Sequence, residues 1–388
     1  MVGIRFDKLG VVIAAIAFYA CLAAPFATFR ANRIVPGEAR SLLEALPPIA
    51  GGALAAVIVI AALIALLRTP LLLRLGASLV ALIAIAVLIG VAGGFLTPED
   101  NNYARVSPAH GFWLLLFAFM LLLADVLTRL ALSPWARILA LLAAAALLGL
   151  LLASGSWDSL SILKEYANRA DSFWTEGGKH LTLALGSLAA AAIVGLPLGI
   201  LCHRVAPLRA SVLNVLNIIQ TIPSIALFGL LIAPLGWIAA NVPGATALGI
   251  RGIGTAPAFL ALFLYSLLPV VANTVVGLAG VPRTANEAAR GMGMTGRQRL
   301  FRVELPLAVP VILTGIRIVL VQNIGLATIA ALIGGGGFGV FVFQGIGQTA
   351  MDLVLLGALP TVMLAFAAAI VLDAVVELTC VQKNGGPS

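Results

Sequence analysis

Long runs of apolar residues follow one another along the chain and are separated by short polar intervals. Runs of about 20 apolar residues have the length of a helix that crosses a bilayer. They lack the alternation typical of strands in a membrane barrel. The pattern therefore predicts an all-α polytopic integral membrane protein with about ten transmembrane helices. We expect these helices at 9–29, 49–67, 75–96, 112–127, 138–153, 181–201, 212–233, 258–278, 307–333 and 353–376.

The first apolar run, 9–29, follows a short basic start with Arg5 and Lys8, which is also how a secretory signal peptide begins. The run is long for a signal peptide and a second run follows soon after it, so we favour a helix that is retained. Further on, Pro223 and Gly229 lie inside an expected helix and can break it.

The composition supports a membrane protein. Hydrophobic residues make up 62% of the chain, charged residues 10%, and the mean hydropathy is +1.13, whereas about a quarter of a soluble domain is charged. The net charge of +8 could indicate a nucleic-acid partner, but in such an apolar chain we interpret it through the positive-inside rule and expect no nucleic acid. Lys and Arg are more frequent in the intervals on the side of the amino terminus, which predicts that both termini are cytoplasmic.

The two halves of the chain differ in their intramembrane polar residues. The first five runs carry few, whereas the later runs contain several amides and hydroxyls in apolar surroundings. Such groups are costly in a bilayer unless they face a bundle interior or a water-filled path. The second half is therefore the predicted transporting part, and its candidate path residues are Asn217, Gln220, Thr221, Asn273, Gln322, Asn323 and Thr328.

A charged stretch, 281–306, interrupts the apolar second half. Thr284 and Glu287 have the spacing of a capping box. We expect a short helix at 285–294 that ends at Thr295-Gly296, because glycine permits a left-handed C-cap. A second short helix would lead into the next membrane helix. The stretch also carries five arginines and a second glutamate, Arg283, Arg290, Arg297, Arg299, Arg302 and Glu304.

One face of the first short helix is predicted to carry mainly small side chains. Ala288, Ala289 and Met292 fall on neighbouring positions, and another protein could approach such a face closely. The alternative is a basic loop that binds anionic lipid headgroups. Capping, small residues and a glycine stop together favour a protein partner.

The spacing in this stretch is specific. Glu287-Ala288-Ala289, three residues, Gly293, nine residues, Val303, one residue and Leu305-Pro306 resemble the EAA motif of the transmembrane subunits of bacterial ABC importers. Valine in place of isoleucine is the one departure. The resemblance implies that these residues form the coupling helix, which docks on an ATPase subunit.

The resemblance extends over 177–378. Within it, 214–232, 264–278 and 315–339 are similar to permeases for osmoprotectants such as glycine betaine, choline and carnitine. This implies a type I permease core in the inner membrane, paired as a homodimer or with a related permease. It also implies cytoplasmic ATPase subunits and an extracytoplasmic substrate-binding protein. ATP would be used by the partner, and we expect no cofactor on this chain, which lacks a nucleotide-binding loop.

The predicted domain organisation follows from these observations. Residues 1–155 form an additional accessory membrane domain of about five helices, since the usual permease of this group begins near the sixth helix. An extracytoplasmic linker spans 156–179. The permease core is 180–378, with its cytoplasmic coupling loop at 282–306, and the cytoplasmic tail is 379–388.

The other candidate sites give weaker indications of function. The GGGGFG sequence lacks the Gly-Lys-Ser/Thr ending of a phosphate loop, so we interpret it as a tight turn. Arg317 lies inside a membrane run, where it needs an ion pair, a carbonyl contact or a role in the path. Asp125, Asp373 and Glu377 lie near helix ends and are expected to reach the interface.

The histidines and cysteines show no metal or catalytic pattern, so no catalytic or metal site is predicted. They are His110, His180, His203, Cys21, Cys202 and Cys380. Without an enzyme-like site, the alternative to an ABC permease is an ion-coupled secondary transporter or channel, which predicts inverted repeats and paired intramembrane charges. Arg317 has no evident partner in the sequence.

Overall fold

A computed structural model of the chain describes residues 6–33, 35–101 and 103–384, with side chains described as far as residue 379. The chain forms two compact units, Met1–Asn168 and Arg169–Ser388. Arg5 and the side chains of Cys380 and Lys383 lie outside the described residues.

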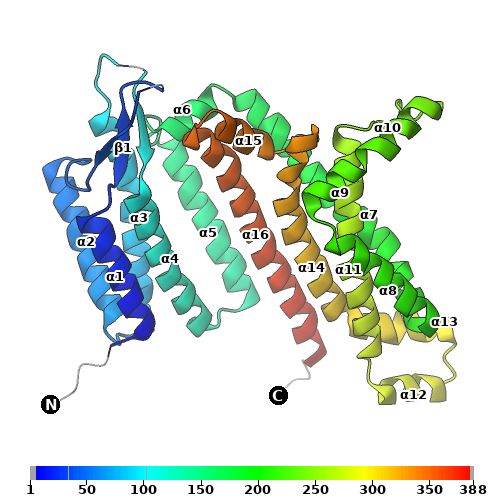
Figure 1. Cartoon of the computed structure of the whole chain (residues 1–388). Helices are drawn as coiled ribbons and strands as arrows, with labels where there is room; N and C mark the ends of the chain where they lie inside the picture. The colour runs from blue at the N-terminus through cyan, green and yellow to red at the C-terminus, as the bar shows by residue number, and fades with distance from the viewer. Residues whose placement is uncertain (1–5, 34, 102, 385–388) are drawn as a thin grey trace. The chain divides into compact units, whose positions relative to one another are not determined.

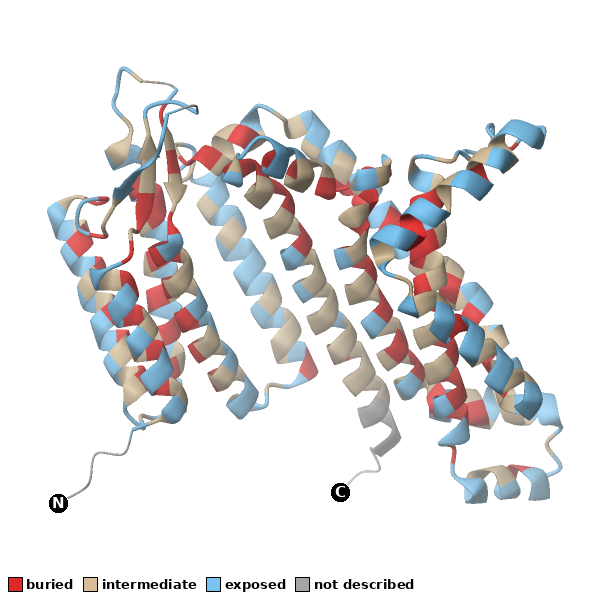
Figure 2. Ribbon diagram, viewed as in Figure 1, coloured by how far each residue is buried: buried red, intermediate tan, exposed pale blue. Residues whose placement is uncertain are grey.

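The first unit consists mainly of helices (Figure 1). The bounds of its helices are α1 Lys8–Leu22, α2 Pro48–Leu66, α3 Leu71–Leu96, α4 His110–Leu130, α5 Pro134–Ala153 and α6 Ser161–Ala167. The helix α1 packs on α2 and α4, and α3 packs on the same two helices, so α1–α4 form a closed four-helix bundle. By contrast, Pro134 is the one buried residue recorded for α5, and Figure 2 shows that helix exposed along its length.

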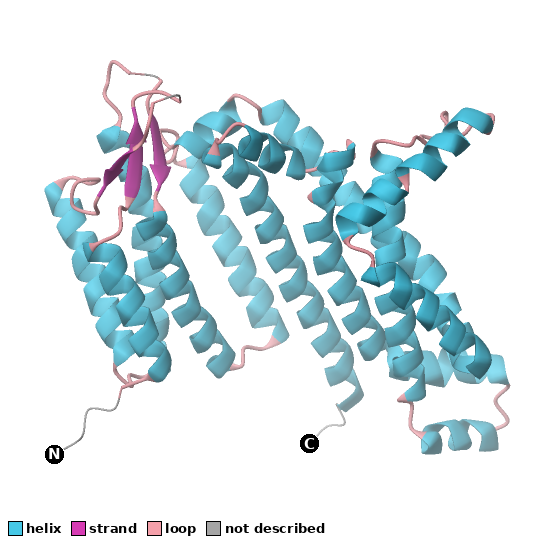
Figure 3. Cartoon of the chain, viewed as in Figure 1, coloured by secondary structure: helices cyan, strands magenta, loops and turns pink. Residues whose placement is uncertain are grey.

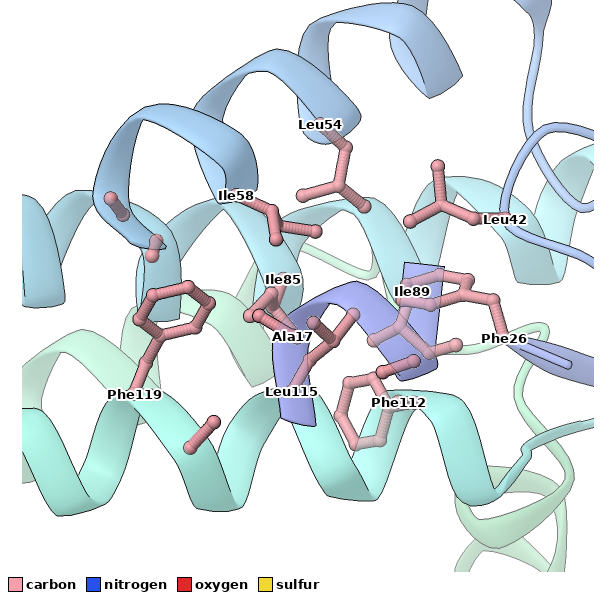
Figure 4. Packing of buried hydrophobic residues seen from close by; sticks show 14 of the residues in the cluster. Ala17, Phe26, Leu42, Leu54, Ile58, Ile85, Ile89, Phe112, Leu115 and Phe119 are labelled. Atoms are coloured by element: carbon pink, nitrogen blue, oxygen red, sulfur yellow. The ribbon is translucent and has the colours of Figure 1, made fainter. Parts of the chain in front are cut away.

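The bundle core is formed mainly by aliphatic and aromatic side chains. Leu54, Ile58, Ile85, Leu115 and Phe119 are each at most 1% exposed, and they point toward one another in Figure 4. Burial of such side chains is the main favourable term for packing in the aqueous parts of a protein, and close van der Waals contact takes over that role within a bilayer. This core explains why the first unit is compact.

A small antiparallel sheet lies at one end of the bundle (Figure 3). Strand β1 (Ala27–Arg30) pairs with β2 (Glu38–Arg40) on one side and with β3 (Arg105–Pro108) on the other. The prediction of a first membrane helix at 9–29 was therefore wrong at its end, because residues from Ala27 onward pair as a strand. Sequence reasoning missed the sheet because its partners are distant and each strand is only three or four residues long.

Helices are the only regular elements among the described residues of the second unit, and two of the short ones are not α-helices. Its elements are α7 Ala170–Arg204, α8 Ala206–Thr221, α9 Ser224–Leu230, α10 Ile232–Asn241, α11 Thr255–Ala279, α12 Arg283–Gly291, α13 Gly296–Arg299, the π-helix η1 Leu300–Glu304, α14 Leu305–Ala327, the 3₁₀-helix η2 Ile329–Ile333, α15 Gly339–Gly347 and α16 Met351–Asn384. The helix α11 packs on α7 and α14, and α14 packs on α16.

The all-α membrane fold predicted from the sequence is confirmed, with differences in the number of spans. Nine helices of the described chain are long and apolar enough to cross a membrane, rather than about ten. The helix Lys8–Leu22 is apolar but has only 15 residues. The predicted helix 212–233 is broken at Pro223, where α8 ends and α9 begins, because proline cannot continue the hydrogen-bond pattern.

The interval 156–179 also differs from a simple linker. It contains α6 and the first residues of α7, which is a single helix of 35 residues. The boundary between the two units falls within it, after Asn168. The roles assigned to the parts of the chain from sequence stay predictions.

Candidate functional site

The helix α12 lies crosswise beyond the end of α11 (Figure 1). It begins at Arg283 after Pro282, and no side chain caps it. Glu287 and Ala288 are exposed, whereas Ala289 is only 1% exposed. The residues predicted to form one face of small side chains thus differ in burial. Ala289 packs inward, and Glu287 and Ala288 remain accessible together with Met292, which is 70% exposed.

Gly293 ends this helix in a Schellman motif. The Met294 N–H donates to the Ala289 carbonyl at 3.1 Å, and the Gly293 N–H donates to the Arg290 carbonyl at 2.9 Å. This pattern requires a left-handed residue at the position of Gly293, and its φ is +78°. A Cβ there would meet nothing within 4 Å. Backbone conformation, and not lack of space, therefore requires glycine.

The capping box is real, but it lies at the start of the next short helix, α13, and not on α12. Thr295 accepts from the Gln298 N–H, and the Gln298 side chain accepts from the Thr295 N–H at 2.8 Å, at the start of α13. The predicted box at Thr284 and Glu287 was wrong, because Pro282 already starts the helix and places Thr284 inside it. The predicted stop at Thr295-Gly296 was wrong as well, because Gly293 is the left-handed glycine that ends α12 and Thr295 already caps the next helix.

Residues 296–327 form one continuous helical segment in which a π-turn interrupts the α pattern. At this turn, η1, the Leu305 N–H donates to the Leu300 carbonyl, a five-residue step instead of four. Pro306 follows directly and has no N–H to donate. Val303 and Leu305 are half-buried, and Pro306 is exposed. The second part of the EAA-like motif thus lies where the charged segment enters the membrane helix α14.

Glu304 is the best-buried charged residue described in this segment, and sequence reasoning gave it no role. It is 3% exposed. One carboxylate oxygen lies 2.5 Å from Nη2 of Arg204, and the other lies 2.9 Å from Nε of Arg299. The signal available in the sequence was its position between Val303 and Leu305, inside the motif.

The predicted path residues on α8 and α11 lie in several environments. Asn217 and Thr221 are exposed on α8. Gln220 is half-buried, and its amide donates to the Tyr265 carbonyl at 2.9 Å. The Asn273 amide donates to the Pro269 carbonyl of its own helix at 2.8 Å. The polar groups of Gln220 and Asn273 are therefore engaged by backbone carbonyls.

On α14 and just after it, Gln322 and Thr328 are half-buried, and Asn323 is fully buried. The Asn323 amide donates to the hydroxyls of Ser187 on α7 and Ser266 on α11, each at 2.9 Å. This network joins three helices in the interior. We interpret Asn323 as a residue that orients these helices, and its assignment to a path stays a prediction.

Arg317 has a partner that the sequence did not reveal. Its guanidinium forms an ion pair with Asp373 on α16, and the two residues are 56 positions apart. The structure thus supports an ion pair for Arg317, and the interpretation of Asp373 as a residue that simply reaches the interface was incomplete.

The GGGGFG sequence is confirmed as a tight turn. Gly336 and Gly337 have φ of +78° and +89°. The Gly337 N–H donates to the Glu176 carboxylate of α7 at 2.7 Å, and the Phe338 ring packs against His180, with ring centroids 5.2 Å apart. Among the described residues, no three His, Cys, Asp or Glu side chains could hold a metal ion.

A second charged cluster closes one end of the α1–α4 bundle. Arg74 is 2% exposed and lies 3.2 Å from Asp7 and 3.6 Å from Asp125, while Arg129 pairs with both carboxylates. Arg74 also donates to the Ala65 carbonyl at the end of α2. Burial by itself would raise the pKa of Asp7, but the Gly10 N–H and the guanidinium groups of Arg74 and Arg129 outweigh burial and lower it from 3.8.

Comparisons with known families match both parts of the chain. Residues 195–379 match the family described as binding-protein-dependent transport system inner membrane component. Residues 7–163 match the N-terminal domain of ABC transporter permease YehY.

Individual proteins are similar over about half of this chain. The osmoprotectant import permease protein OsmW of Salmonella typhimurium is 45% identical over 195 residues, which cover 50% of this chain and 84% of OsmW. The glycine betaine/carnitine/choline transport system permease protein OpuCB of Bacillus subtilis is 37% identical over 202 residues, 52% of this chain and 84% of OpuCB. A chain of the MetNI methionine ABC transporter, solved in inward-facing conformations, aligns with a TM-score of 0.47 and 23% identity over 54% of this chain and 95% of its own length.

Proposed function

The chain belongs to the family of inner membrane components of binding-protein-dependent transport systems, and from this premise we propose that it moves an osmoprotectant into the cytoplasm as the permease subunit of an ABC importer. The substrate class is that of glycine betaine, choline and carnitine. It is supported by the relatives OsmW and OpuCB, which are permease proteins for such compounds. The chain is a multi-pass membrane protein, and we propose that both termini face the cytoplasm.

The observation that carries the proposal is the geometry of the segment 283–306. An exposed short helix presents Glu287 and Ala288. This helix, α12, is terminated by Gly293, which must adopt a left-handed conformation. The next short helix, α13, continues without a break into the membrane helix α14. A partner that bound α12 could therefore transmit movement into the transmembrane part. This is what coupling to an external motor requires.

In the proposed mechanism, separate cytoplasmic ATPase subunits hydrolyse ATP, and this chain contributes no hydrolytic group. Closure of the ATPase dimer would displace α12 and shift two permease subunits between inward-open and outward-open states. ATP can drive that change only through contacts that differ between the states. An extracytoplasmic binding protein would deliver the substrate. The candidates to line its path are those predicted from the sequence, Asn217, Gln220, Thr221, Asn273, Gln322, Asn323 and Thr328.

Uptake measurements on variants of the segment test this function. The full chain is produced together with its proposed ATPase and binding-protein subunits, and ATP-dependent uptake of labelled glycine betaine and choline is measured. Glu287→Lys places a repulsive charge at the exposed docking face, and we expect uptake to be lost while membrane insertion is unchanged. Arg297→Gln, on the exposed face of α13, is the matched control. Full uptake by Glu287→Lys, or absence of an ATPase subunit from the purified assembly, would contradict the proposal.

One observation bears on the alternative of an ion-coupled transporter. The Arg317–Asp373 pair supplies the paired intramembrane charges that such a transporter predicts. The pair is satisfied internally, however, and the relatives do not favour this alternative. Uptake that persisted without ATP and followed an ion gradient would favour it.

A further inference from the structure

Glu304 is a charged side chain in an environment that does not tolerate an unpaired charge. It ends the π-turn η1 and is 3% exposed. A buried carboxylate is costly unless opposite charges and hydrogen bonds compensate it. Glu304 has such compensation from two arginines, and the positions of these arginines indicate what the residue does.

The two carboxylate oxygens of Glu304 face different parts of the unit. Nη2 of Arg204, the last residue of α7, lies 2.5 Å from one oxygen, and these residues are 100 positions apart. Nε of Arg299, the last residue of α13, lies 2.9 Å from the other oxygen and is only five positions away. One ion pair therefore links the charged segment to a separate membrane helix, and the other lies within the segment.

Side-chain packing between α7 and the segment is incomplete beside this ion pair. An open apolar cleft of about 870 Å³ lies between α7 and the helical run of η1 and α14. Ile193 and Leu201 line it from α7, Phe301 and Leu313 line it from the other side, and Arg204 also belongs to its lining. Leu196 and Ile200 of α7 pack on the same apolar cluster as Leu300 of η1 and Leu305 of α14, and beside the cleft the ion pair adds a polar link between the end of α7 and η1.

The segment is otherwise connected so that movement of α12 reaches Glu304. The helix α12 contacts both α13 and η1, and η1 continues directly into α14. A displacement of α12 thus acts on α14 through the backbone. It acts on α7 through the Glu304–Arg204 pair.

We infer that Glu304 is a positioning residue for coupling, which holds the segment 283–304 to the end of α7 through Arg204 so that α7 and α14 move together. The inference rests on the proposed function. Glu304 contacts neither substrate nor nucleotide in this role. The Glu304–Arg299 ion pair shapes the segment. The Glu304–Arg204 ion pair transmits the movement of the segment to α7.

Neutral variants of nearly the same size distinguish the roles of the two ion pairs of Glu304. In the assembled importer, uptake and ATP hydrolysis are measured for Glu304→Gln, Arg204→Gln and Arg299→Gln. Arg302→Gln is the matched control, because it removes one charge from the same segment at an exposed position. Loss of one partner of a buried ion pair is strongly unfavourable, so we expect substrate imported per ATP hydrolysed to fall roughly tenfold in Glu304→Gln and Arg204→Gln.

A purely structural role predicts a different pattern. It would lower the amount of assembled importer without changing substrate imported per ATP, and Arg299→Gln would do as much harm as Arg204→Gln. We expect Arg299→Gln to have the smaller effect, Arg302→Gln to behave as the unmodified protein, and Arg204→Lys, which retains the charge, to restore most of the coupling. Normal coupling in both Glu304→Gln and Arg204→Gln would overturn the inference.

A second measurement separates this inference from the proposed function. Hydrogen exchange of residues 283–299 is followed in the purified chain without ATP or substrate. Faster exchange in Arg204→Gln than in Arg302→Gln supports the link even if the unmodified importer transports no osmoprotectant, in which case the proposed function alone fails. Equal exchange in the two variants overturns the link.

Discussion

The two units use their charged residues in opposite ways. In the first unit, Arg74 is almost completely buried, and it and Arg129 share the same two carboxylates. In the second unit, the charged segment leaves Glu287 and several arginines exposed, and only Glu304 among its described charged residues is buried. Charges satisfied within one unit stabilise it, whereas exposed and ordered charges are available to a partner. This difference agrees with our proposal that the charged segment of the second unit receives force from a partner.

The largest effect on stability is expected at the buried charged cluster around Arg74 in the first unit. Arg74→Met removes the buried cation between Asp7 and Asp125 and leaves both carboxylates with Arg129 alone. Breaking a buried ion pair by removing one partner costs about 3–5 kcal/mol, so thermal unfolding of the solubilised full chain should begin at a clearly lower temperature. Arg68→Met is the control, since Arg68 is exposed nearby. If both variants unfold alike, the charged cluster does not stabilise the first unit.

A smaller effect is expected at the glycine stop of the second unit. Gly293→Ala forces a Cβ into the left-handed conformation, at a cost of about 1–2 kcal/mol. Gly296→Ala is a closely matched control, because a Cβ at either glycine would meet nothing within 4 Å and only Gly293 has a positive φ.

Hydrogen exchange of residues 283–299 measures this difference in the purified chain. We expect faster exchange in Gly293→Ala and unchanged exchange in Gly296→Ala. Equal rates in the two variants would mean that the Schellman motif does not hold α12 in place.

The smallest effect concerns pH and the charged cluster of the first unit. The pKa of Asp7 is lowered in the folded chain from its ordinary value of 3.8. Its carboxylate therefore contributes stability above about pH 4, and this contribution is lost as the pH falls through the folded pKa. Acid unfolding of the unmodified chain should show a component below pH 4 that Asp7→Asn lacks. An identical acid transition in both proteins would contradict the role of Asp7.

Local sequence patterns predicted most of the fold and much of the candidate site. Long apolar runs located the membrane helices from 49–67 onward to within a few residues in most cases, because helix length and apolar composition depend on neighbours along the chain. The EAA-like spacing located Gly293, and its left-handed φ gives a physical reason for that glycine. The capping box was predicted on the wrong short helix, since Thr284 and Glu287 have the same spacing as a real box, and only Pro282 decides where α12 begins.

The sequence by itself determined that this chain spans a membrane and that its second half carries the polar interior, and it led to the proposal that 281–306 is a docking element. These properties follow from composition, apolar periodicity and spacing within short windows. Only the tertiary structure decided the partners of distant residues, namely Arg317 with Asp373, Asn323 with Ser187 and Ser266, and Glu304 with Arg204. Each pair depends on which helix faces meet, and that is set by the packing of the whole unit and not by any local pattern.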